Sequence, residues 1–552
     1  MATRKGTSTG GGYSRRTFLT GLGLGLGAAG AAGVATGVSL GRIDLRAHDV
    51  VPGNFTRMFP DLPPFFDKLE PAGATDPLRD IMRDLGKPGG LLDANDAISA
   101  GPVALIADAT VNGNSPATNP DNPTHTAGVT FFGQFMDLDM TFDSRSTLGV
   151  PTDPAATPNA KTVPYLDLDT VYGQGPNVSP QYYDVNDNAR LRIESGGIFE
   201  DLPRNADGTA IIPDPRTDQN MMVSGLHCAF ILFHNRAVDY VRQQEGLIDP
   251  AAIFAEAKRL TTWHYQWLIL NEFLPLFVGP AMVSDIVTNG RRFYQPAKGE
   301  AAMPIEFQGA CFRVGHTMIR PSYRANLKGD NGKPFFGFIF DPSLGDLTSG
   351  TVKDPGDLRS GFRAPRRFIG WQTFFDFKDG EVKRNKQIDT KISTPLFTLP
   401  LAAIASHKAP IALMQRNLLR HMTWSMPSGQ AIAGAMGVDR LSAEDLKELK
   451  TYGIGLEQST PLFYYMLKES ALVPNSDIGK NAGGFHLGPV GGRIVGEVVI
   501  GLLQADPSSY LVQRPDWTPT LQNPGSGFRM TDFLTFAGVD PATRRAQKPS
   551  FA

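Results

Sequence analysis

The chain has 552 residues, of which 41% are hydrophobic and 20% are charged, a balance typical of a globular protein with one large domain or several smaller ones. Lysine and arginine (53) nearly balance aspartate and glutamate (55), so the chain lacks the basic excess of proteins that bind nucleic acid or membrane surfaces. Its two cysteines, Cys228 and Cys311, exclude a disulfide framework and a cysteine-based zinc site, and their apolar surroundings predict buried thiols.

The N-terminus carries an export pattern. Arg15 and Arg16 precede a weakly apolar run of glycine, alanine and leucine over residues 21–40. This pattern predicts a signal over residues 1–41 that the twin-arginine export machinery reads, and a periplasmic or secreted product. A membrane anchor is the alternative, since the run is long enough to span a bilayer but rich in glycine.

Three further regions follow the signal. Residues 42–125 are rich in Pro, Gly, Asp and Asn, which predicts an N-terminal arm that wraps a core. Residues 126–540 hold the strongly periodic segments and form the predicted main domain, and residues 541–552 are a C-terminal tail.

Apolar periodicity predicts helices in the main domain, in chain order, over residues 126–142, 221–244, 251–274, 310–320, 410–426, 442–450 and 492–504. Strand-like alternation is scarce, and no repeat of 20–50 residues is visible. The abundant glycine (59) and proline (43) indicate long loops. The prediction is therefore a mainly α fold, one large helical domain with long loops, which fits a buried cofactor.

The first motif lies in the helix predicted over 126–142. Helical spacing places Gln134, Asp137, Leu138 and Thr141 on one face, with Asp139 about 100° further round. Polar side chains on the inner face of an apolar helix need partners, so the motif is consistent with a ligand or cofactor. Ordinary capping and ion pairing are the alternative.

The second motif is a loop with alternating carboxylates, Asp167 and Asp169. Carboxylate oxygens of this kind are ligands that calcium takes, with backbone carbonyls completing the shell. Taken alone, the pattern is common and is better explained by a solvated turn.

The remaining motifs extend to the C-terminal part of the chain. They are Asp214–Gln219 before a helix, Phe312–Thr317, Arg416–Arg420 with Pro427–Gln430, and Leu487–Val495. In this order, the motifs resemble those of the animal-type (peroxidase–cyclooxygenase) haem peroxidases, and more closely the bacterial members. The resemblance extends from about His125 to about Leu511 and implies a large helical domain that binds haem b.

The resemblance assigns roles on the proximal side of the haem. His316 matches the axial ligand of the iron, and Asn417 matches the asparagine that contacts its other ring nitrogen. Arg313 and Arg420 match positions near the haem propionates or the proximal helix. The alternative for His316 is a core histidine with no iron.

On the distal side, Arg216 matches the catalytic arginine that helps to polarise the peroxide O–O bond, with a salt bridge to a loop carboxylate as the alternative. Gln134 matches the glutamine that interacts with water or halide. The family pattern has a histidine where Leu138 stands. Leucine cannot take or return the peroxide proton. General acid–base catalysis of this kind typically raises the rate ~10²–10⁴-fold. The nearest histidine, His125, lies 13 positions upstream.

The resemblance also implies a calcium site that ties the distal helix to its loop. Asp139, Asp167 and Asp169 match side-chain ligands of the ion, and Tyr165 and Val163 match the other positions. The family usually has a threonine at the position of Val163, so one side-chain ligand is missing.

Two carboxylates link the haem covalently in the mammalian branch. Asp137 keeps the first position, but the second is Gln219, whose amide cannot form such an ester, so at most one link can form. His227 and His234, seven positions apart on one helix face, lack an evident third ligand, and we expect structural roles for both.

Several functions remain open. The first is peroxide-dependent oxidation of a small organic donor, weakened or altered by Leu138. The second is oxygenation or peroxygenation of a lipid-like substrate with dioxygen or peroxide. The others are haem binding without turnover and an inactive variant of an ordinary peroxidase.

Overall fold

The computed structural model describes residues 53–115, 118–143, 145–161, 164–347, 352–474 and 483–546. These residues belong to one unit, Asp49–Ala552, and are mainly helical, which confirms the predicted fold class. The predicted export signal over residues 1–41 lies outside the described residues. Within the described part of the chain, no helix combines the length and apolarity needed to cross a membrane.

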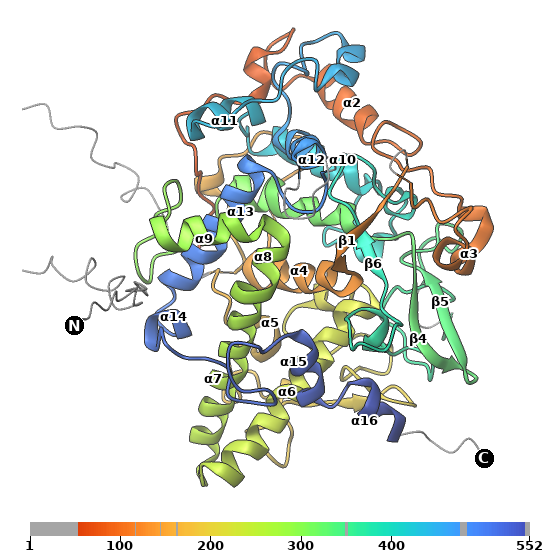
Figure 1. Cartoon of the computed structure of the whole chain (residues 1–552), viewed down its shortest axis with the longest axis vertical. Helices are drawn as coiled ribbons and strands as arrows, with labels where there is room; N and C mark the ends of the chain where they lie inside the picture. The colour runs from red at the N-terminus through yellow and green to blue at the C-terminus, as the bar shows by residue number, and fades with distance from the viewer. Residues whose placement is uncertain are drawn as a thin grey trace, which may run out of the picture. The chain divides into compact units, whose positions relative to one another are not determined.

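Four long helices organise the fold: α4 (Ala127–Met140), α6 (Met221–Gln244), α7 (Pro250–Leu268) and α13 (Pro489–Ala505). Asn220 and Asp249 cap the N-termini of α6 and α7, and their side-chain oxygens accept from backbone N–H groups that a helix start leaves free. In Figure 1, α4 lies near the middle of the described elements, between α6 and α7 on one side and α10, α12 and α13 on the other.

The shorter helices, in chain order, are α2 (Asp76–Leu85), α3 (Gly101–Ala107), α5 (Asp169–Tyr172), α8 (Leu274–Val278), α9 (Pro280–Asn289), α10 (Leu413–Thr423), α11 (Gly429–Met436), α12 (Leu462–Leu472), α14 (Tyr510–Gln513), α15 (Met530–Ala537) and α16 (Pro541–Ala546). The helix predicted over 251–274 is interrupted by a π turn at Ile269–Phe273. The segment 310–320 is a π turn followed by the 3₁₀ helix η9 (Phe312–Met318), and 442–450 holds only the start of a 3₁₀ helix, Lys447–Tyr452.

The strands are few, as predicted. They form three antiparallel pairs: β1 (Asp121–Thr126) with β6 (Arg384–Lys386), β2 (Glu194–Ser195) with β3 (Glu200–Asp201), and β4 (Ser322–Asp330) with β5 (Lys333–Phe338). The longest pair places Tyr323 opposite Gly337. These ribbons border the helical core.

The N-terminal arm packs on segments that lie much later in the chain. The Thr56 N–H donates to the Met303 carbonyl (3.0 Å), and the Phe65 N–H donates to the Met426 carbonyl (2.9 Å). Helix α2 packs against α10, so the arm supports the helix that carries Asn417. The described part of the predicted arm therefore contains helices and contributes to the main core.

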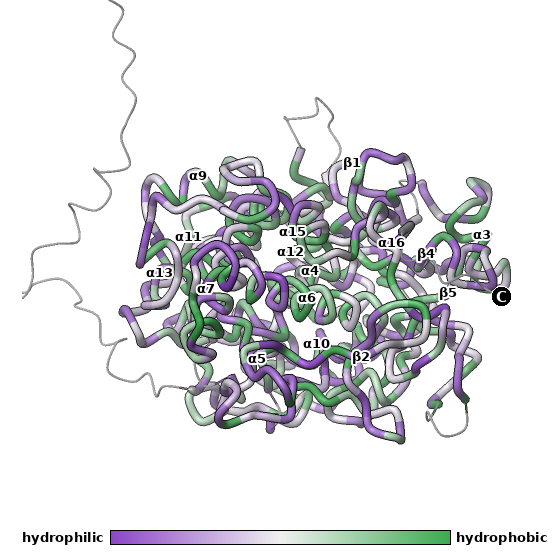
Figure 2. Tube along the Cα trace, turned by 90° about the horizontal axis from the view of Figure 1, so that it is seen from below, coloured by the Kyte–Doolittle hydropathy of each residue, from purple (hydrophilic) through white to green (hydrophobic). Residues whose placement is uncertain are grey.

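The core is one continuous cluster of buried apolar side chains that involves all the long helices. Twelve of the 14 residues of α4 are buried. Figure 2 shows hydrophobic segments of the chain around α4, α6 and α12 and hydrophilic segments along much of the periphery. Cys228 and Cys311 are buried free thiols, which confirms the prediction made for them.

Candidate functional site

A cavity of about 900 Å³, a volume that includes its mouth to solvent, is lined by residues of α4 and η9, two elements that also contact each other. The α4 residues that are only half-buried, Gln134 and Asp137, both line it. From η9, Arg313 and His316 line the opposite wall. The structure thus brings the distal-helix motif and the proximal-histidine motif to one cavity, although 182 positions separate Gln134 from His316 in sequence.

His316 presents one ring nitrogen to the cavity and the other to the protein. Its Nδ1 lies 3.0 Å from Nδ2 of Asn417, which α10 supplies. Among the described residues, Nε2 has no hydrogen-bond partner. Burial, with repulsion from Arg313, lowers the pKa of His316 to about 3, so the ring is neutral. A neutral imidazole with a free nitrogen is what an iron ligand requires.

The side-chain oxygen of Asn417 is buried and has no partner among the described residues. A half-turn of the amide places this oxygen at Nδ1 of His316, where it accepts the Nδ1–H proton. That arrangement leaves the Nε2 lone pair free for a metal and satisfies the orphaned oxygen. The pair therefore fits a metal-bound histidine better than an isolated core histidine.

Arg313 is a half-buried cation with no ion-pair partner among the described residues. Its Nε donates to the Gln308 carbonyl (2.7 Å), and no carboxylate of the described residues lies within ion-pair distance of it. Burial, with repulsion from Arg420 and Arg416, lowers the pKa of Arg313 to about 10. A charge of this kind needs an anionic partner, and the open cavity can supply one.

Arg420 behaves differently from Arg313. It forms an ion pair with Asp143, donates to Ser146 Oγ (2.6 Å) and lies over the Trp424 ring (4.8 Å from its centroid). It does not line the cavity. In this structure Arg420 therefore holds a loop against α10.

The side of the cavity formed by α4 and by the residues just before α6 is called the distal wall, and it carries three amide side chains. Gln134, Gln219 and Asn220 line the cavity and form a hydrogen-bonded chain. Asn220 was not among the sequence-based candidates. Its position as the N-cap before an apolar helix was visible in the sequence, but the contact with Gln134 depends on the fold.

Asp137 is the carboxylate among the lining residues. Its Oδ1 accepts from Thr141 Oγ1 (3.2 Å). Burial raises the pKa of Asp137, and the positive charges of Arg313 and Arg216 oppose that rise. Gln219, which matches the second haem-linking position of the mammalian branch, lies on the same cavity wall.

No histidine stands at the distal wall of the described cavity. Leu138 is 4% exposed, packs in the apolar core and is not a lining residue. His125 is buried away from the cavity with Nε2 2.8 Å from the Leu276 carbonyl. Sequence distance had argued against His125 as a substitute base, and its position in the structure agrees.

Arg216 lies outside the lining and caps α4. Its Nη atoms donate to the carbonyls of Leu138 (2.9 Å) and Thr141 (2.6 Å), at the C-terminal end of that helix. Its Nε and Nη2 donate to both oxygens of Asp214 (3.0 and 2.6 Å). The guanidinium thus makes the salt bridge that was the alternative to a catalytic role, and the catalytic assignment stays a prediction.

Asp139, Asp167 and Asp169 form an acidic cluster, with one ligand atom from each within 4.8 Å of the others. Burial, with repulsion from the other two carboxylates, raises the pKa of Asp139 well above its usual range. Lys161 Nζ lies 2.6 Å from Asp169 and 3.4 Å from Asp214, so it partly neutralises the cluster.

Of the two other predicted calcium positions, Val163 lies outside the described residues. The Tyr165 hydroxyl donates to the Ala505 carbonyl (3.2 Å), which leaves its backbone carbonyl as the predicted ligand. The structure therefore brings the three predicted carboxylates together and adds Lys161, which sequence reasoning missed because its contacts depend on loop geometry.

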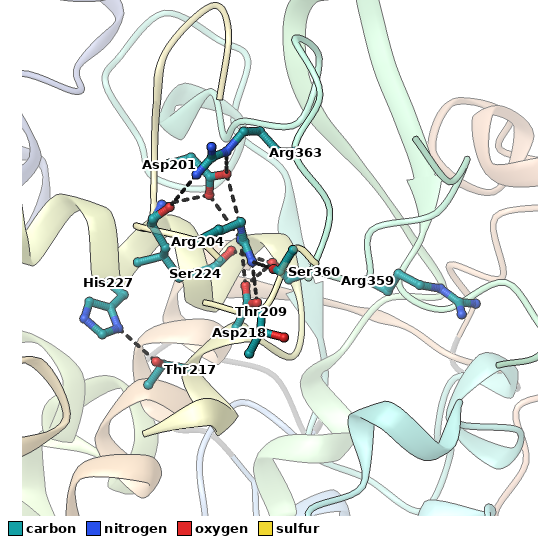
Figure 3. Close-up of polar contacts among 12 residues, drawn as sticks. Asp201, Arg204, Thr209, Thr217, Asp218, Ser224, His227, Arg359, Ser360 and Arg363 are labelled. Atoms are coloured by element: carbon teal, nitrogen blue, oxygen red, sulfur yellow. Dashed lines mark hydrogen bonds and ion pairs between the residues drawn. The ribbon is translucent and has the colours of Figure 1, made fainter. Parts of the chain in front are cut away.

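An ion-pair network anchors the segment before α6 (Figure 3). Arg204 holds Asp218 (2.6 Å) and Asp201 (3.0 Å), and Ser360 Oγ donates to Asp218 (2.5 Å). The backbone N–H of Ser360 donates to the Gln219 carbonyl (3.2 Å). These contacts hold the backbone of Gln219, through its own carbonyl and through the side chain of the preceding residue, Asp218.

Both histidines of α6 have protein partners, and the structural roles expected for them agree with these contacts. His227 Nδ1 lies 2.8 Å from Thr217 Oγ1, as Figure 3 shows. His234 lies between the Tyr172 hydroxyl (3.0 Å) and the Ala189 carbonyl (2.8 Å). Neither belongs to a metal-binding group among the described residues.

Comparisons with known proteins agree with this geometry. A family model described as animal haem peroxidase matches residues 149–343, a segment that holds Arg216, Gln219 and His316. Chorion peroxidase of Aedes aegypti is 27% identical over 177 residues, 29% of this chain and 22% of that protein. The match thus spans about a fifth of the curated relative.

The fold is similar to solved structures over most of the chain. Peroxidase A from Dictyostelium discoideum has a TM-score of 0.53 at 14% identity, with 83% of this chain and 88% of that chain covered. Fatty acid alpha-dioxygenase from Oryza sativa has a TM-score of 0.50 at 14% identity, with 77% and 76% covered. These likenesses show a shared fold.

Proposed function

We propose that the chain, which is similar to animal haem peroxidases over residues 149–343, is a member of the animal-type haem peroxidase superfamily, binds haem b between α4 and η9 and catalyses peroxide-dependent oxidation of a small organic donor. One observation carries the proposal. His316 presents a free, neutral Nε2 to a cavity, and Asn417 contacts its other ring nitrogen. The narrower placement in a bacterial branch stays a prediction.

The residues around the cavity fit the cofactor. His316 would hold the iron, and the orphaned Asn417 oxygen would accept the Nδ1–H proton and raise the basicity of the ring. Arg313, which has no carboxylate partner among the described residues, would neutralise a haem propionate. Haem bound there supplies a redox-active iron that reacts with peroxide.

The distal side determines how well the chain manages protons. A peroxidase needs a group that takes a proton from hydrogen peroxide and returns it to the departing oxygen. Gln134 and Gln219 can donate hydrogen bonds, but a neutral amide does neither proton transfer. We therefore expect turnover ~10²–10⁴ below that of a site with a distal base.

A second function has its own support. Much of the cavity wall away from the amides is apolar, formed by the side chains of Phe273, Phe277, Phe340, Leu396, Leu399 and Leu413. A wall of this kind favours a hydrophobic substrate, so oxygenation of a lipid-like molecule is the alternative enzyme activity. A haem protein without turnover is the third proposal.

Calcium and export complete the proposal. Asp139, Asp167 and Asp169 would hold a calcium ion with backbone carbonyls, at an affinity reduced by Lys161 and by the missing threonine. The paired arginines Arg15 and Arg16 support export of the chain by the twin-arginine machinery.

The test is an optical spectrum of the purified ferric protein before and after one equivalent of hydrogen peroxide. We expect a haem absorption band that shifts slowly, because the distal wall lacks a histidine. A band that does not respond would favour oxygenation or haem binding alone. If protein produced with ample haem showed no band, the assignment of His316 as an iron ligand would be wrong.

A further inference from the structure

The side-chain amides of the distal wall have one defined orientation. Asn220 Oδ1 accepts from the Val223 backbone N–H (3.1 Å) at the start of α6. A backbone N–H can only donate, so the other end of the Asn220 amide must be the NH₂ group. That group donates to Gln134 Oε1 (3.2 Å). The start of α6 therefore fixes which way Asn220 faces.

The same logic extends to Gln219. With its oxygen occupied by Asn220, Gln134 faces Gln219 through its own NH₂ group and donates to Gln219 Oε1 (3.2 Å). The remaining end of the chain is Gln219 Nε2. Among the described residues, this nitrogen has no acceptor, and its side chain lines the cavity. The chain thus ends in N–H donors at an open wall.

The backbone of Gln219 is held rigidly enough for a directed donor. Ser360 donates to its carbonyl, and the preceding residue, Asp218, is locked by Arg204 and by Ser360 Oγ (Figure 3). The following residue, Asn220, pairs with Arg359 in an isolated antiparallel bridge. A donor fixed before its ligand arrives loses little conformational entropy on binding.

We propose that Gln219 Nε2 is the terminal, pre-oriented hydrogen-bond donor of this cavity and selects small ligands that accept hydrogen bonds, above all anions. The inference rests on the proposed function, because it concerns the ligand that binds opposite His316. It gives the distal wall a polarity that the sequence did not predict. Gln219 Nε2 offers a ligand a hydrogen bond, whereas the missing histidine would have exchanged a proton.

The test is fluoride binding to the ferric haem protein, measured by optical titration. Fluoride is a small anion that accepts hydrogen bonds strongly. Because a hydrogen bond to a charged group is lost, Gln219→Leu should weaken fluoride binding about tenfold. Methyl isocyanide, an uncharged ligand of ferrous haem that accepts hydrogen bonds poorly, serves as the comparison probe on the reduced protein, and its affinity should change less than about twofold.

A second variant tests the orientation. Asn220→Ser keeps a good N-cap for α6 but removes the NH₂ group that holds Gln134. Its denaturation midpoint should equal that of the wild type, while its fluoride affinity should fall about threefold because Gln219 can turn. Gln458→Leu, an exposed glutamine far along the chain, is the matched control and should leave both ligands unaffected.

The outcomes separate the two proposals. If the wild-type protein takes up no haem, the proposed function and this inference both fall. If Gln219→Leu takes up haem and binds fluoride as tightly as the wild type, only the donor role of Gln219 is overturned. A wild-type fluoride affinity in Asn220→Ser would show that the amide chain does not orient it.

Discussion

The two walls of the cavity differ in how their polar groups are used. On the wall formed by η9 and α10, His316 Nε2 and Asn417 Oδ1 have no hydrogen-bond partner, and Arg313 has no carboxylate partner, among the described residues. On the α4 side, Gln134 binds two other amides, and Arg216, which lies outside the lining, binds Asp214 and helix carbonyls. One wall is open for a ligand, whereas most of the other is satisfied internally.

The difference indicates that cofactor binding depends on the η9–α10 wall and proton transfer on the α4 side. A buried cation or oxygen without a partner costs stability, so partners left out on one wall indicate an expected ligand. On the α4 side, Arg216 is already paired, and the amides that line the cavity can donate hydrogen bonds but cannot exchange a proton. Binding should therefore be robust in this protein and turnover should be limited.

The largest expected effect comes from removing the His316 imidazole, whose Nε2 has no partner among the described residues. His316→Ala should lower haem affinity at least about 100-fold, since loss of groups that only support a ligand already costs 10–100-fold. Absorbance titration with haem measures it, and added imidazole should restore the haem band. His407→Ala, at an exposed histidine, is the control. Unchanged affinity in His316→Ala would place the iron ligand elsewhere.

The next prediction adds a histidine to the α4 wall. Leu138→His should raise the rate of reaction with hydrogen peroxide, by up to ~10²–10⁴ if the imidazole reaches the cavity beside Gln134 and Asp137. Because Leu138 is buried, the variant should also melt at a lower temperature. Stopped-flow absorbance and thermal melting measure the two effects. No gain in rate would mean that Leu138 does not limit the chemistry.

The third prediction concerns Arg216 as the cap of α4. Arg216→Gln should lower the free energy of unfolding of the haem-free protein by about 3 kcal/mol, because Asp214 loses its buried partner. Urea denaturation measures this loss. Arg83→Gln, at an exposed ion pair, should cost less than about 1 kcal/mol. An unaffected midpoint in Arg216→Gln would favour the catalytic assignment over the structural one.

The smallest effect should come from Arg313. Arg313→Gln should leave the haem-free protein as stable as the wild type or slightly more stable, because the cation has no carboxylate partner among the described residues. Haem affinity should fall about tenfold through loss of a charge-assisted contact. A strongly destabilised haem-free variant would contradict the view that Arg313 awaits a ligand.

Sequence periodicity predicted the long helices well. The segment predicted over 221–244 is helix α6 with the same bounds, because an Asn cap precedes a long apolar run there. The turn at Ile269–Phe273 and the irregular helix that carries His316 were missed. Their π and 3₁₀ hydrogen bonding depends on how neighbouring helices pack, and local sequence does not encode that packing.

The residues of the site also differ in how far the sequence could predict their roles. The resemblance of the motifs to those of haem peroxidases implied a common site for Gln134, His316 and Asn417. The structure brings Gln134 and His316 to one cavity and places Asn417 beside His316. The roles of Arg216 and Lys161 depend on which carboxylates the loops bring near: Asp214 for Arg216, and Asp169 with the more distant Asp214 for Lys161. A sequence shows that a charge is present, but only the fold shows which partner satisfies it.

The packing of the N-terminal arm sets an order of assembly. Met58 contacts Glu306, 248 positions later, and Arg57 contacts Trp424, 367 positions later. Synthesis makes the arm first, but its partners emerge only after most of the chain exists. Contacts of such sequence separation form late and slowly. Because α2 packs on α10, the support for His316 should mature after synthesis is complete, and haem capture should follow it.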